Sequence, residues 1–256
     1  MREVQVVMGM PITAEVLDGD ASAALGDTFA YFRAIDERFS TYKDASEIMR
    51  INRGEIPETA WSAEMREVFA LAEKTKYETR GYFDIRRPDG LIDPSGVVKG
   101  WAIYKAAQHL NQGGHRNFFI DAGGDVATSG TNANGEPWSV GIRNPFDQTQ
   151  IVKVVYPRGT GVATSGTYIR GKHIYDPHTG LPPQGKTEKS DFSVLVSLTV
   201  LGPDVLQADL FATAAFAMGA NGIGFIEQQP GLEGYAIDEY GEATLTSGFE
   251  RYTIMP

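Results

Sequence analysis

The sequence predicts an α+β fold with largely antiparallel sheets, and three features lead to this class. Amphipathic helical patterns dominate residues 20–112, short β-rich runs fill residues 117–192, and a strand, a helix and a short β tail follow. Helices and strands therefore neither alternate strictly, as a doubly wound fold requires, nor separate into two blocks. No linker, internal repeat or low-complexity tract interrupts the chain. We expect one domain over residues 1–256, or two closely packed α+β halves within it.

The first part of the chain predicts one strand and three helices. Residues Val4–Val16 alternate between apolar and polar side chains, which is typical of a half-buried strand. Asp20–Phe39 and Ser62–Thr79 repeat apolar residues at three- and four-residue intervals, which indicates amphipathic helices. A third helix is expected from Gly96 to Gln112, ended by a Gly-Gly pair.

The remainder of the chain predicts mostly strands. The runs "NFFIDAGGDVATSG", "WSVGIRN" and "QIVKVVYP" are rich in β-forming residues and are separated by Gly, Asn and Pro. The run "FSVLVSLTVL" predicts another strand, and Pro203-Asp204 opens a further helix. The glycine-dense "GANGIG" has the wrong order for a nucleotide loop, so it predicts a helix end followed by a turn.

Composition excludes several classes of function. With 23 basic and 33 acidic residues the net charge is −10, which repels nucleic acid and anionic membranes. The absence of cysteine excludes disulfides, thiolate metal sites and a cysteine nucleophile. The first 16 residues alternate like a strand where a signal peptide needs a continuous apolar stretch. We therefore expect a cytoplasmic protein for the sequence as given, or an exported one if a leader was removed.

One apolar segment, "ADLFATAAF", carries a carboxylate and a hydroxyl four residues apart. On a helix Asp209 and Thr213 share one face, and that face is mostly apolar. An unpaired carboxylate there is costly, so Asp209 requires a cation, a proton or hydrogen-bond donors. In one interpretation Thr213 bonds back to the backbone while Asp209 accepts from a loop. In the other, the two oxygens bind a hard cation such as Mg²⁺.

Three other polar clusters have both a functional and a structural interpretation. "DPSGVVKGWA" places a lysine in the first turns of a helix whose free amides suit a phosphate, or it is a plain turn and cap. The glycines of "IDAGGDVATSG" admit a ligand close to the backbone, or form a bulge. "ATSGTYIRGKHIYDPHTGLP" is as polar as many functional loops, although its "DPHTG" is also good turn chemistry.

Taken together, these segments resemble the ApbE family of Mg²⁺-dependent FAD:protein FMN transferases over nearly the whole chain. The resemblance is carried by "MGMPI", "FSTYKDASEIMRIN", "GYFDI", "DPSGVVKGWA", "DAGGDVATSG", "VATSG" followed by "HIYDPHTGLP", and "ADLFATAAFAMG", all in register. It implies an α+β fold related to the tunnelling folds, with FAD between the two halves and the metal at its pyrophosphate.

The resemblance also implies the site residues. The metal ligands fall on the carbonyl of Gly96 and on the side chains of Asp209 and Thr213. His173 and Asp176 would help to build the catalytic site. The contacts with FAD fall on the following residues: Met8, Tyr42, Tyr82, Phe83, Asp84, Asp93, Lys99 and Ile174. The chain departs from the family pattern at four positions: Val97, Val98, His178 and Ala212. Because some relatives carry an acidic residue in place of Ala212, the metal site here is expected to have one carboxylate fewer.

The implied reaction transfers FMN from FAD to a Thr or Ser hydroxyl of a target flavoprotein and releases AMP. Mg²⁺ and Lys99 are expected to neutralise the phosphates. His173 is the hypothetical proton acceptor because imidazole titrates near neutral pH, with Asp176 as the fallback. The partners expected are FAD and an acceptor flavoprotein of the redox-pump or reductase-subunit type. Two alternatives stay open: a Mg²⁺-dependent FAD pyrophosphatase and a flavin-binding protein without turnover.

Overall fold

An eight-stranded antiparallel sheet organises the chain, and its neighbours follow the order β1-β2-β3-β4-β7-β8-β9-β10. The computed structural model describes residues 1–166, 174–181 and 193–255. The strands of this sheet are β1 Arg2–Val7, β2 Met10–Val16, β3 Phe118–Ala122, β4 Asp125–Ser129, β7 Gly161–Gly166, β8 Leu195–Gly202, β9 Glu233–Asp238 and β10 Ala243–Leu245. The predicted α+β class with largely antiparallel sheets is therefore confirmed.

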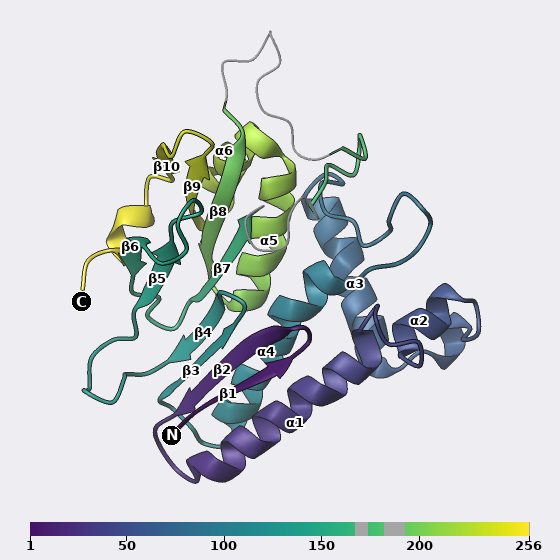
Figure 1. Ribbon diagram of the computed structural model, residues 1–256, viewed down its shortest axis with the longest axis horizontal. Helices are drawn as coiled ribbons and strands as arrows, with labels where there is room; N and C mark the ends of the chain where they lie inside the picture. The colour runs from purple at the N-terminus through teal and green to yellow at the C-terminus, as the bar shows by residue number, and fades with distance from the viewer. Residues whose placement is uncertain (167–173, 182–192, 256) are drawn as a thin grey trace.

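Helices cover one face of this sheet (Figure 1). α1 Ala21–Phe39 packs on β1 and β2, α4 Ser95–Gln112 on β3 and β4, and α5 Val205–Ala217 on β7 and β8. α1 and α5 begin at aspartates, Asp20 and Asp204, whose carboxylates accept from backbone N–H groups of the first turn. Between α1 and α4 the chain forms α2 Glu47–Asn52, η1 Glu58–Ala60 and α3 Ala63–Glu78.

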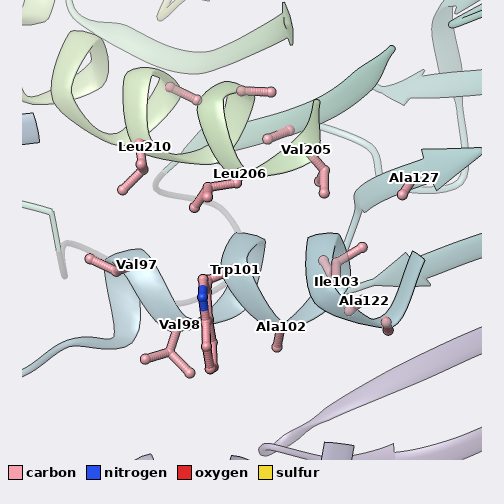
Figure 2. Packing of buried hydrophobic residues seen from close by; sticks show 14 of the residues in the cluster. Val97, Val98, Trp101, Ala102, Ile103, Ala122, Ala127, Val205, Leu206 and Leu210 are labelled. Carbon is pink, nitrogen blue, oxygen red and sulfur yellow. The ribbon is translucent and has the colours of Figure 1, made fainter. Parts of the chain in front are cut away.

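α4 and α5 pack closely side by side, and this contact positions the site. Leu206 and Leu210 of α5 point toward α4 (Figure 2), and both are buried. The approach is closest at Gly100, where an added Cβ would lie 2.7 Å from Cβ of Asp209 and 3.1 Å from the carbonyl oxygen of Val205. A side chain at this position would force the helices apart.

A smaller apolar cluster fills the opposite face of the sheet. The hairpin of β5 Val140–Arg143 and β6 Ile151–Val155 lies there together with the short helix η3 Phe249–Tyr252. The inward side chains of the hairpin pack on those of the sheet, and the buried members are Val126, Val140, Ile142, Val155, Val162, Leu201, Tyr235, Ile237 and Phe249.

The middle of the sheet is only weakly joined. β4 and β7 pair at two positions, Val126 with Val162 and Ala127 with Gly161. Beyond the Val126–Val162 pair, a side chain takes the place of backbone pairing between the strands. The carboxylate of Asp125 accepts a hydrogen bond of 3.1 Å from the backbone N–H of Thr164. The two strands therefore diverge here, and the opening leads from the helical face toward the β5–β6 hairpin.

Two predicted elements differ from the structure. Val4–Val16 is a hairpin and not one strand, because Met8 and Gly9 adopt positive φ angles of 56° and 72° and reverse the chain. "GANGIG" continues as the 3₁₀ turn η2 Gly219–Asn221 and the helix α6 Gly222–Glu227, and not as a simple turn. Gly222 permits this because an added Cβ would lie 2.0 Å from the carbonyl oxygen of Ala215. No helix in the described ranges is long and apolar enough to cross a membrane.

Candidate functional site

A cavity of about 1160 Å³ opens where β4 and β7 diverge. Its walls are the N-terminal turns of α4, the middle of α5, the β3–β4 turn, the strand β5 and the segments 82–93 and 174–180. Ligand pockets in proteins usually measure roughly 300–1,000 Å³, so this cavity has room for a ligand as large as a dinucleotide.

The three residues expected to bind metal converge on the cavity wall. Gly96, Asp209 and Thr213 all line it, and an added Cβ on Gly96 would lie 3.8 Å from Cγ2 of Thr213. The hydroxyl of Thr213 is 3.5 Å from that of Ser165. Carbonyl, hydroxyl and carboxylate oxygens are the ligands that Mg²⁺ prefers, so the donor set fits this cation.

Backbone geometry supports a role for the Gly96 carbonyl. In a helix this oxygen is the usual acceptor of the Gly100 N–H. Here the Gly100 N–H donates a hydrogen bond of 2.8 Å to Oδ2 of Asp209. The bond holds the carboxylate against α4 beside Gly96, whose carbonyl oxygen has two lone pairs and so can accept a helix bond and still bind a ligand.

The carboxyl of Asp209 is fully buried and electrostatically unusual. Burial is the largest influence and raises its pKa to about 7, Lys99 opposes this increase, and the negative charge of Asp125 adds to it. The Lys99 Nζ lies 3.4 Å from Oδ1 of Asp209. The first interpretation of the Asp209–Thr213 pair expected donors from a loop; the donors found are a backbone N–H and an ammonium of α4.

Asp125 is the second carboxylate of the site, and it was not expected from the sequence. This side chain is 0% exposed, and its Oδ2 lies 2.5 Å from the Lys99 Nζ. That oxygen has no hydrogen bond of good geometry in the described ranges, so the ammonium is its counter-charge. Gly123 and Gly124, both with positive φ, form the tight β3–β4 turn just before it. The position of this aspartate directly after a Gly-Gly turn is the sequence feature that could have marked it as a site residue.

Six of the eight residues expected to contact FAD line the cavity. They are Tyr82, Phe83, Asp84, Asp93, Lys99 and Ile174. Asp84 is fixed by an ion pair of 2.6 Å with Lys76. Asp93 accepts from the Ser95 N–H at 3.1 Å and so helps to start α4, whose N-cap residue Pro94 offers no side-chain acceptor.

The other predicted residues are placed differently. Met8 is half-buried in the turn between β1 and β2 and packs on the core, while its neighbours Gly9 and Met10 line the cavity. Tyr42 is 96% exposed and is not part of the cavity wall. Asp176 is also outside the wall, and its Oδ1 accepts from the backbone N–H of His178 at 2.9 Å. His173 lies outside the described residues.

His178, where the chain departs from the family pattern, joins two walls of the cavity. Its Nε2 lies 3.0 Å from the carbonyl oxygen of Arg80, and its Nδ1 lies 2.9 Å from Oδ1 of Asp176. Its ring also packs on Tyr82, with centroids 4.5 Å apart. This residue therefore fixes the segment 174–181 to the segment 80–84.

Among the described residues, the cavity wall carries more acidic than basic side chains. Arg87, Arg143 and Lys99 are the basic residues of this described part, and the two arginines were not expected from the sequence. The acidic residues of the wall are Asp84, Asp89, Asp93, Asp121 and Asp209. Arg87 is itself paired with Asp89 at 2.7 Å. An anionic ligand would therefore need an added cation to neutralise its charge here.

Comparison with known proteins agrees with this geometry. The family model described as "ApbE family" matches residues 8–87 and 86–236. A Klebsiella pneumoniae (strain 342) protein named FAD:protein FMN transferase is 33% identical over 168 residues, which are 62% of this chain and 46% of that protein. A Vibrio cholerae protein of the same name is 33% identical over 141 residues, 52% of this chain and 40% of the relative. The matched region thus spans less than half the length of these relatives.

Solved structures show the same fold. The flavin transferase ApbE from Vibrio cholerae superposes with a TM-score of 0.84 at 23% identity, covering 98% of both chains. The apo form of the Pseudomonas stutzeri flavinyl transferase ApbE gives a TM-score of 0.82 at 20% identity, covering 99% of this chain and 97% of the other. With the family model matched over most of its length, the chain belongs to the ApbE family.

Proposed function

We propose that this protein transfers FMN from FAD to a Thr or Ser hydroxyl of an acceptor flavoprotein, with Mg²⁺ as cofactor and AMP as the second product. The observation that carries the proposal is the meeting of Gly96, Asp209 and Thr213 at the N-terminal turns of α4, inside a cavity large enough for FAD. The relatives named FAD:protein FMN transferase supply the reaction class.

The cavity offers suitable contacts for each part of FAD. The N-terminal turns of α4 direct their backbone dipoles toward a bound diphosphate, and Lys99 adds a positive charge one turn further along. Tyr82 and Phe83 provide aromatic surface on the wall for a ring system. The excess of aspartates over basic residues in the described part of the wall favours a diphosphate that arrives with a divalent cation.

The reaction is a phosphoryl transfer in which positioning and charge neutralisation dominate. The acceptor hydroxyl oxygen forms a bond with the FMN-side phosphorus, the bond from that phosphorus to the bridging oxygen breaks, and AMP leaves with that oxygen. When bound, Mg²⁺ would neutralise charge on the pyrophosphate oxygens, held by Asp209, Thr213 and the Gly96 carbonyl. His173 remains our hypothesis for the base that takes the hydroxyl proton.

The test combines the protein with FAD, Mg²⁺ and an acceptor flavoprotein that carries a Ser/Thr flavinylation motif. Mass spectrometry should show an acceptor heavier by one FMN, and chromatography should show an equal amount of AMP. An acceptor whose target hydroxyl residue is changed to Ala is the matched control. AMP without a gain in acceptor mass would identify a pyrophosphatase, and binding of FAD without either product would identify a flavin-binding protein.

A further inference from the structure

A largely buried cluster of three charges lies at the cavity wall, which includes Lys99 and Asp209 but not Asp125. Lys99 comes from α4, Asp125 from β4 and Asp209 from α5. The ammonium lies 2.5 Å from Oδ2 of Asp125 and 3.4 Å from Oδ1 of Asp209, and its own side chain is 20% exposed. Two carboxylates thus share one ammonium in a setting where water screens charge poorly.

This arrangement limits what Lys99 offers to a ligand. Lys99 lines the cavity, but its charge is neutralised by Asp209, which is also part of the wall, and by Asp125, which is not. A diphosphate that enters alone has to compete with both carboxylates for the same ammonium. A cation bound at Asp209 removes one of these competitors, because that carboxylate then has another positive partner.

We propose that Asp125 is a positioning residue that restrains Lys99 against the carboxylates in the absence of metal, so that a divalent cation and FAD bind cooperatively. The inference rests on the proposed function, which places FAD in the cavity and the cation at Asp209. Coupling between two ligands is reciprocal, so FAD tightens cation binding by the same factor.

Asp125→Asn tests this role with little change of shape. An amide oxygen can still accept the hydrogen bond from the Thr164 N–H that Asp125 receives at 3.1 Å. The charge that holds Lys99 is removed, and the NH₂ group of Asn is a poor partner for an ammonium. The variant therefore separates the restraint on Lys99 from the support that Asp125 gives to the diverging strands.

The experiment measures FAD affinity by quenching of flavin fluorescence, once in EDTA and once in saturating Mg²⁺. For the wild type we expect Mg²⁺ to tighten FAD binding about tenfold or more, within the usual range of such coupling. Asp125→Asn should tighten FAD binding in EDTA about fivefold and reduce the effect of Mg²⁺ to less than about threefold. Linkage requires that FAD changes the Mg²⁺ affinity of each protein by the same factor by which Mg²⁺ changes its FAD affinity.

Asp121→Asn is the charge-matched control. Asp121 lines the same cavity, but its carboxylate accepts from the Gly124 N–H at 2.8 Å, and no ion pair in the described ranges joins it to Lys99. This variant removes a charge of the wall without releasing Lys99, so it should lower the coupling much less than Asp125→Asn does. An equal effect of Asp121→Asn would show a general charge effect and would overturn the proposal, as would unchanged coupling in Asp125→Asn.

A second variant keeps the proposal testable if Asp125→Asn does not fold. Lys99→Gln should weaken FAD binding about tenfold in Mg²⁺ but less than about threefold in EDTA, because the ammonium is already engaged without metal. Equal losses in both conditions would overturn the role of Asp125. Absence of FAD binding by the wild type in Mg²⁺ would instead contradict the proposed function itself.

Discussion

The backbone N–H of Gly100 donates a hydrogen bond of 2.8 Å to Oδ2 of Asp209, and the space between the two residues admits no side chain. In Gly100→Ala the new Cβ would lie 2.7 Å from Cβ of Asp209, so α5 has to move away from α4. Overpacking costs about 1–3 kcal/mol, which outweighs the gain of roughly 1 kcal/mol from the better helix propensity of Ala. We expect urea unfolding to show a loss of about 1–2 kcal/mol and FMN transfer to fall sharply.

Gly26→Ala is the matched control for this prediction. Gly26 also lies inside a helix, α1, but nothing lies within 4 Å of an added Cβ. Only the higher helix propensity of Ala than of Gly affects stability at this position, so the variant should be more stable by about 0.5–1 kcal/mol. Stabilisation by both substitutions would show that the α4–α5 contact at Asp209 is not tight.

The buried carboxyl of Asp209 predicts a pH dependence of stability in metal-free protein. Burial raises its pKa from 3.8 to about 7, so between these values the folded state holds a proton that the unfolded state has lost. Ionisation of an acid whose pKa is raised in the folded state destabilises the fold. The free energy of unfolding should therefore fall as pH rises from about 4 to about 7. Asp209→Asn does not ionise and lacks this effect.

The measurement compares wild type and Asp209→Asn by urea unfolding in EDTA at several pH values. Other carboxyl groups titrate in both proteins and cancel in the difference. The wild type should lose stability relative to the variant by on the order of 1–3 kcal/mol between pH 4 and pH 7. A difference that stays constant across this interval would mean that Asp209 is already ionised at low pH.

Local sequence patterns were sufficient for the elements and for most of the site. The helix predicted over Asp20–Phe39 and the helix predicted to open at Pro203-Asp204 both begin directly after an aspartate N-cap, because helix starts depend on residues close in sequence. The family motifs placed Gly96, Asp209 and Thr213 together, and the structure brings them to one wall.

The rest of the site depends on contacts between distant segments. Asp125 faces Lys99 because α4 packs on the face of β4 that carries Asp125 and Ala127, and no pattern within β4 indicates which helix covers that face. The same holds for His178, whose contact with the Arg80 carbonyl joins residues 98 positions apart. The hairpin at Met8 was missed because alternation continues on both sides of the turn.

Thr213→Val tests the hydroxyl as a cation ligand, since Val keeps the shape and removes the oxygen. We expect Mn²⁺ affinity, measured by calorimetry, to fall at least about tenfold while the unfolding midpoint changes little. Thr75→Val is the control, because Thr75 is also a helical threonine and its hydroxyl donates at 2.9 Å to the Leu71 carbonyl in α3. Equal Mn²⁺ affinities in the two variants would show that the Thr213 hydroxyl is not a cation ligand and serves only in its contact with Ser165.

Tyr42 is predicted to contact FAD although its side chain is 96% exposed and lies outside the cavity wall. Stacking of an aromatic side chain on a base contributes about 1–3 kcal/mol, so Tyr42→Ala should weaken FAD binding roughly 5- to 150-fold in a fluorescence titration. Loss of an exposed ring should leave the stability of the fold nearly unchanged. Tyr77→Ala removes another exposed tyrosine, 88% exposed on α3, and should leave FAD affinity at the wild-type value. If both variants bind FAD like the wild type, Tyr42 is a surface residue, because a ring that stacks on the ligand cannot be removed without loss of affinity.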